Sequence, residues 1–151
     1  DSILALDKIK STKLASVLNI DHVTCGEAAT CVDQRESPYA EQSKVLLESN
    51  VVGIRHVFQG CGADYSGLGL DDLVSKAGAD SLSRQVSADL QALQQLLAAM
   101  PSPSLLEPLT TSRESVVQLH DAAKRVTDAF KGELVLVLEV NVPDILKGDN
   151  D

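Results

Sequence analysis

The sequence is poor in aromatic residues, in cysteine and in long apolar runs. It has no tryptophan, and aromatic residues make up 3% of its 151 residues. The core must therefore be built from leucine, valine, isoleucine and alanine, a composition that favours helices over a β-sandwich. No apolar run approaches the roughly 20 residues that cross a bilayer, so no transmembrane segment is predicted. Three cysteines are too few for a scaffold that depends on disulfides.

Basic residues are also scarce, and they are scattered along the chain. The sequence carries 22 acidic and 13 basic residues, for a net charge of −9. Such a charge repels phosphate backbones, so nucleic acid is excluded as a partner. A hydrophobic content of 44% indicates a globular chain, and the length fits a single domain over residues 1–151. A signal peptide is lacking and the chain opens on Asp1, which predicts a mature or trimmed fragment.

Apolar residues recur at helical spacing along most of the chain. In the first helix Leu6, Ile9, Val17 and Ile20 form a stripe that Lys13 interrupts. A loop that ends at Pro38 is expected after this helix. The predicted helices cover residues 1–20, 39–60, 82–100 and 111–130, with a shorter one beginning at Asp71 and interrupted at Gly78. The fold class is therefore all-α, an up-down bundle of about four helices.

Prolines separate the third and fourth long helices. Pro101 and Pro103 end the third helix, and Glu107 and Pro108 lead into the fourth, for which Thr111 or Ser112 is the expected cap. Two apolar stripes of nearly full helix length, joined by a short loop, predict an antiparallel helical hairpin.

Residues 134–138 read LVLVL, which fits either a buried strand or a helix. The β-branched alternation and Gly132 favour a strand. A lone strand has no partner in a chain that is otherwise helical. We therefore predict that the last helix continues past Gly132 to about Val140.

The segment from Leu47 to Val74 contains the densest glycine cluster, with Gly60, Gly62, Gly67 and Gly69. Its apolar stripe predicts a helix that ends at Gly60 or Gly62. Asp71 and Asp72 then stand where the next helix favours negative charge. Gly62 and Gly67 have P-loop spacing, but Leu68 replaces the phosphate-binding lysine. We predict that the glycines form a structural connection between helices.

Cys25 and Cys31 lie in the loop after the first helix, with His22 nearby. This grouping favours a disulfide over two free thiols, and both over a metal site or a Cys/His nucleophile pair. Zinc sites usually show two close ligand pairs, and a catalytic cysteine needs a positioned base. Cys61 is left without a partner in this interpretation.

The remaining histidines suggest no catalytic set. His56 is predicted to flank the apolar face of its helix, and His120 and Asp121 are predicted to lie on the surface. The tail GDND could supply only a weak cation site. No catalytic, cofactor-binding or metal-ligating residue is assigned from these patterns.

Two parts of the sequence resemble the second half of imelysin-like proteins, a family also classed among the peptidases. The similarity covers roughly residues 45–151, and residues 1–44 match poorly. Its motifs are an Asn-x-x-Gly-Ile segment, a glycine turn, a Gly-Leu-x-Leu helix start and an acidic end. The residues concerned are Asn50, Gly53, Ile54, Gly60, Gly67, Leu68, Gly69, Leu70, Asp71, Asp72, Leu73 and the closing GDND, where Asn150 stands in place of the usual glycine.

The resemblance implies an all-α protein of two bundle-like halves, in the bacterial periplasm or associated with the outer membrane. It also implies a link to iron uptake, with iron or another divalent metal in the full-length protein. The family's hallmark is a Gly-x-His-x-x-Glu motif in the first half. The nearest string here has one residue too many between Gly53 and His56, and Gln59 replaces the glutamate. No catalytic residue is carried over.

Three functions are compatible with the sequence. The first is a non-enzymatic envelope protein for metal or haem acquisition or for partner binding. Its partner would be the N-terminal half of the same protein or another envelope protein. The second is an imelysin-type metallopeptidase whose catalytic motif lies outside this chain, and the third is a structural helical interaction module.

Overall fold

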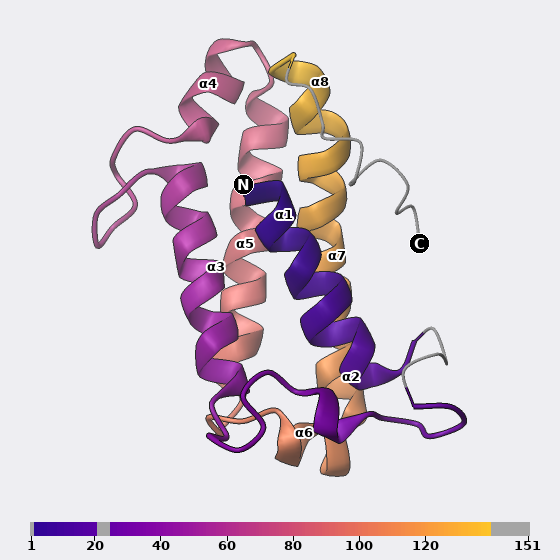
Figure 1. Ribbon diagram of the computed structural model, residues 1–151. Helices are drawn as coiled ribbons and strands as arrows, with labels where there is room; N and C mark the ends of the chain where they lie inside the picture. The colour runs from indigo at the N-terminus through magenta and orange to yellow at the C-terminus, as the bar shows by residue number, and fades with distance from the viewer. Residues whose placement is uncertain (1, 21–24, 140–151) are drawn as a thin grey trace.

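The computed structural model describes residues 2–20 and 25–139, and every regular element in these ranges is helical. Four long helical segments lie side by side as a bundle (Figure 1). The first segment consists of α1 (Ser2–Lys8), η1 (Ile9–Ala15) and α2 (Ser16–Leu18), which follow one another without a break. The second is α3 (Ser43–Gln59) and the third is α5 (Asp80–Ala99). The fourth consists of α7 (Arg113–Ala129), η3 (Phe130–Leu134) and α8 (Val135–Val137). The all-α class and the bundle of about four helices are confirmed. Three shorter helices are η2 (Val32–Gln34), α4 (Leu70–Lys76) and α6 (Leu106–Thr111).

The core is built almost entirely from aliphatic side chains on the predicted stripes. On α5 every stripe residue is buried, from Leu82 through Leu93 to Met100. The α7 stripe from Val116 to Phe130 is buried in the same way, and α5 packs against both α3 and α7. Burial of apolar area at about 25 cal/mol per Å² is the main term that stabilises such a bundle.

The N-terminal helix follows a different spacing from the predicted one. Its buried side chains are Leu6, Ile9, Lys10, Leu14, Val17 and Leu18, whereas Ile20 lies past the helix and is 46% exposed. Residues Ile9–Ala15 form a π-helical segment, which has more residues per turn than an α-helix. The wider turn brings Leu14 to the core face five residues after Ile9. The predicted helix is confirmed, and the prediction for Ile20 is wrong because the helix ends at Leu18, where Asn19 takes a left-handed conformation with φ of 51°.

The C-terminal helix continues past Gly132, as predicted. Residues Phe130–Leu134 form a second π-helical segment and Val135–Val137 return to α-helix. Leu134 is buried in the common core, so this stretch needs no partner strand. Val140 and the tail GDND lie outside the described residues.

Two predicted boundaries are wrong: the start of the second long helix, expected at residue 39, and the place of Glu107 and Pro108, expected in the approach to the fourth long helix. α3 begins at Ser43, since the N–H groups of Lys44 and Val45 donate to the Pro103 carbonyl at 3.1 and 3.4 Å. Glu107 and Pro108 belong to α6, a separate short helix. Ser112 is the N-cap residue of α7 but makes no capping bond with its side chain.

Candidate functional site

The residues between α3 and α4, 60–69, form a tight turn whose glycines are required by close backbone contacts. A Cβ on Gly60 would lie 2.1 Å from the Gly67 carbonyl oxygen, and a Cβ on Gly69 would lie 2.2 Å from the Phe58 carbonyl oxygen. Gly60 also has φ of 92°, a conformation that side chains disfavour. We call residues 60–69 the glycine turn. It projects from the upper left of the bundle in Figure 1.

Arg55 at the end of α3 is fixed against the glycine turn by three neutral partners. Its guanidinium carbon lies 3.9 Å from the ring centroid of Tyr65, which is cation–π geometry. Its Nε donates to Gln59 Oε1 at 2.9 Å, and its Nη1 donates to Gln94 Oε1 on α5. All four side chains belong to residues of intermediate exposure. The guanidinium is therefore held in one orientation at the edge of the bundle.

Tyr65 is held in an unusual backbone conformation. Its φ is 55°, in the left-handed region that costs a bulky residue on the order of 1 kcal/mol. The ring of His56 lies 5.2 Å from the Tyr65 ring, centroid to centroid, at an angle of 47°. Contacts with Arg55 and His56 together offset the backbone strain. We call Arg55, His56, Tyr65, Gln59 and Gln94 the Arg55 cluster.

Acidic residues lie within the glycine turn and directly after it. The Ser66 hydroxyl and the N–H groups of Asp64 and Ser66 lower the pKa of the exposed Asp64 carboxyl, which therefore stays ionised at neutral pH. Burial raises the pKa of Asp71, and the charge of Asp72 acts in the same direction. Asp72 Oδ2 accepts the Gly69 N–H at 2.9 Å and so caps the start of α4.

The glycine turn exposes two further side chains, Cys61 and Leu68. Cys61 is a free, exposed thiol, and Leu68 is 93% exposed. Neither side chain contributes to the Arg55 cluster.

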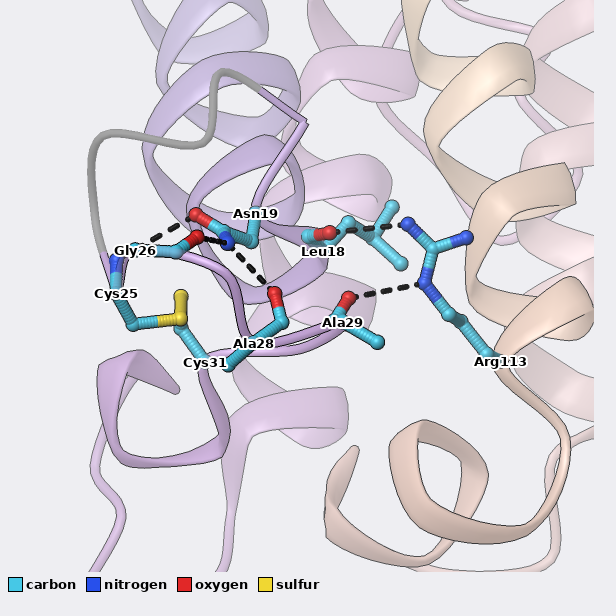
Figure 2. The surroundings of a disulfide bond; sticks show 8 residues. All are labelled: Leu18, Asn19, Cys25, Gly26, Ala28, Ala29, Cys31 and Arg113. Carbon is cyan, nitrogen blue, oxygen red and sulfur yellow. Dashed lines mark hydrogen bonds between the residues drawn. A yellow bond between two sulfur atoms is a disulfide. The ribbon is translucent and has the colours of Figure 1, made fainter.

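At the other end of the bundle, a disulfide joins Cys25 to Cys31, with 5.8 Å between their Cα atoms. Figure 2 shows how Asn19 and Arg113 hold the enclosed loop. The Asn19 amide donates to the Gly26 and Ala28 carbonyls, both at 2.7 Å. Arg113 at the start of α7 donates to the carbonyls of Ala29 at 3.1 Å and Leu18 at 3.0 Å. The disulfide loop is thus attached to two helix ends.

Replacing both Cys25 and Cys31 with serine is expected to lower the free energy of unfolding by about 2 kcal/mol. A cross-link between residues six positions apart lowers the conformational entropy of the unfolded chain, and this loss corresponds to roughly that free energy. Urea denaturation followed by circular dichroism measures the change. The matched control is Cys61→Ser, which removes an exposed thiol and should leave the midpoint unchanged. An unchanged midpoint in the double variant would contradict a stabilising disulfide.

The two histidines in the described part of the chain lie on different helices, His56 on α3 and His120 on α7. His22 lies outside the described residues, and His56 flanks the apolar face of α3. Asp121 is exposed, but the His120 side chain is only 12% exposed and contacts Asp121 Oδ1 through Nδ1 at 3.2 Å. The prediction of a surface position therefore holds for Asp121 and only in part for His120, whose side chain is mostly covered. Within residues 2–20 and 25–139, no group of three His, Cys, Asp or Glu side chains could hold a metal ion.

These observations define a helical bundle protein with a rigid glycine turn at one end and a disulfide-closed loop near the other. The imelysin family model matches residues 3–132, so the chain belongs to the imelysin family. The match begins far ahead of residue 45, where the resemblance was expected to start, so the first helix is part of the family's domain. No curated protein matches the sequence and no solved structure matches it. Among residues 2–20 and 25–139, none of the helices combines the length and the apolar character of a membrane-spanning segment.

Most of the Arg55 cluster could not be predicted from the sequence. Gln94 is polar and lies outside the apolar stripe of α5, yet it is half-buried and binds Arg55. Asp89, also outside that stripe, contacts Arg125 of α7 at 3.5 Å. The one available signal was Tyr65, an aromatic residue inside a glycine-rich turn of a sequence that has only two tyrosines.

Proposed function

We propose that this chain is a non-enzymatic binding protein of the imelysin family that serves iron acquisition in the bacterial envelope. The Arg55 cluster carries this proposal. A guanidinium held by amides and an aromatic ring is suited to binding a ligand or partner, because its remaining donors are already oriented. Such an arrangement offers no nucleophile activated by a neighbouring base.

The disulfide supports the envelope location. Disulfides persist in oxidising compartments such as the bacterial periplasm and are rare in the cytosol. The Cys25–Cys31 bond closes a loop that Asn19 and Arg113 hold in place, so the protein uses the bond structurally. The link to iron rests on the family resemblance.

The alternative function, a metallopeptidase, would require a bound metal ion. Hydrolysis by a bound zinc ion needs three protein ligands and a general base. In this alternative the motif that supplies them would lie outside the chain, and a longer protein would show activity that a chelator abolishes.

The test uses cells that produce the protein, grown with ample and with limiting iron. We expect the protein in the envelope fraction with Cys25 and Cys31 oxidised, and at higher abundance when iron is limiting. We also expect the purified protein not to cleave casein. Casein cleavage that EDTA abolishes would overturn the non-enzymatic role. A cytosolic location or an abundance independent of iron would overturn the corresponding part of the proposal.

A further inference from the structure

We propose that Arg55, His56 and Tyr65 form a binding site for a carboxylate group, which would belong to a ligand or to a partner protein. This inference deepens the proposed binding function, on which it rests, by naming the chemistry that the site recognises. The site lies where the last turns of α3 meet the glycine turn and the middle of α5.

The positive charge of Arg55 has no partner of opposite charge among the described residues. Its two side-chain acceptors are amide oxygens. Other basic residues of the chain do find carboxylates, as Arg35 does with Glu41 and Arg125 with Asp89. In a chain of net charge −9, an oriented arginine with neutral acceptors keeps its positive charge uncompensated.

The guanidinium of Arg55 also has free donors in the number and orientation that a carboxylate needs. A guanidinium has five N–H donors in a planar fork, and the two glutamines accept two of them. The Nη2 atom and one N–H of Nη1 are left for a ligand. These atoms match the two oxygens of a carboxylate in a bidentate pair, which is among the stronger hydrogen-bonded arrangements in proteins.

The surroundings of Arg55 hold its side chain rigidly. Tyr65 lies against the guanidinium, the glutamine on α5 fixes its position, and the glycine turn cannot open without separating the Gly60 and Gly67 backbones. A ligand therefore meets an arginine that is already ordered, which reduces the entropic cost of binding. The ring of His56 adds a second group that can donate a hydrogen bond next to Tyr65.

The surrounding charges favour a carboxylate over a phosphate. Asp64 precedes Tyr65, and Asp71 and Asp72 follow the same turn. Repulsion by these carboxylates and by the net charge acts on each negative charge of a ligand. A singly charged carboxylate meets less repulsion than a phosphate dianion while using the same donors.

Titration of the ¹⁵N-labelled protein with benzoate, followed by NMR, tests the site. We expect saturable shifts of the Arg55 Nε–Hε resonance and of the glycine-turn amides. Benzamide has the same shape without the charge. Its affinity should be lower than that of benzoate by at least about ten-fold, because a charge-assisted hydrogen bond is lost. Inorganic phosphate should also bind more weakly than benzoate.

Three variants complete the test. Arg55→Gln should weaken benzoate binding by about ten-fold or more, and Arg55→Lys should weaken it several-fold because lysine cannot form the bidentate pair. Arg84→Gln is the matched control, since it makes the same change of charge at an exposed residue about 15 Å from Gln94 along α5. Melting curves verify the fold of each variant, and Arg55→Lys keeps the test decisive if Arg55→Gln does not fold.

Several results would overturn the proposal. They are no saturable binding by the unaltered protein, tighter binding of phosphate than of benzoate, unchanged affinity in the Arg55 variants, or an equal loss in Arg84→Gln. Casein cleavage is measured separately, so the proposed non-enzymatic role and the carboxylate site can fail independently.

Discussion

Replacing Phe58 with alanine is expected to lower the free energy of unfolding by about 4 kcal/mol. Phe58 is fully buried, and its ring centroid lies 5.5 Å from that of Phe130 in the C-terminal helix. These two are the only phenylalanines in the sequence, and the substitution leaves a cavity beside the remaining one. Urea denaturation followed by circular dichroism measures the effect.

The matched control is Val57→Ala at the neighbouring position. Val57 is 48% exposed, so its substitution should change the free energy of unfolding by about 0.5 kcal/mol or less. Equal effects at the two positions would show that Phe58 does not occupy the core.

Replacing Gly60 with alanine is expected to lower the free energy of unfolding by about 3 kcal/mol. The new methyl group would lie 2.1 Å from the Gly67 carbonyl oxygen, which is backbone and cannot rotate away, and φ at this position is 92°. Backbone strain and overpacking each cost about 1 to 3 kcal/mol. We also expect the Tyr65 and Arg55 resonances to shift, because the turn must open.

Gly53→Ala provides the control for Gly60→Ala. Gly53 lies within α3, and an added Cβ there would meet nothing within 4 Å. Alanine favours the helix over glycine by about 0.5 to 1 kcal/mol, so this variant should be more stable than the natural protein. A loss of stability at Gly53 would mean that the family's Asn-x-x-Gly motif requires this glycine for something other than space.

Much of the bundle could be predicted because a long apolar stripe at helical spacing indicates a helix that buries one face. The stripes of α5 and α7 repeat every three or four residues without interruption, and all their members are buried. Boundaries were harder to predict. α3 begins where Pro103 accepts its first N–H groups, a contact with a residue some sixty positions away that local sequence does not reveal.

The candidate site was harder to predict than the core. Gln94 is polar and lies beside the α5 stripe, a position that local sequence alone would place in solvent. Its contact with Arg55 depends on how α3 packs against α5, and a spacing pattern contains no information about that distance. The glycine turn was recognised as structural, but the backbone contacts that make its glycines necessary depend on the folded path of the chain.

The two π-helical segments have a consequence for how related sequences should be aligned. Each segment contains an extra residue relative to an α-helix, which rotates the following side chains by about 100°. A relative that lacks one residue within 9–15 or 130–134 could keep the same core by forming a plain α-helix there. Single-residue gaps at these two places would therefore mark a change of helix type and leave the fold intact.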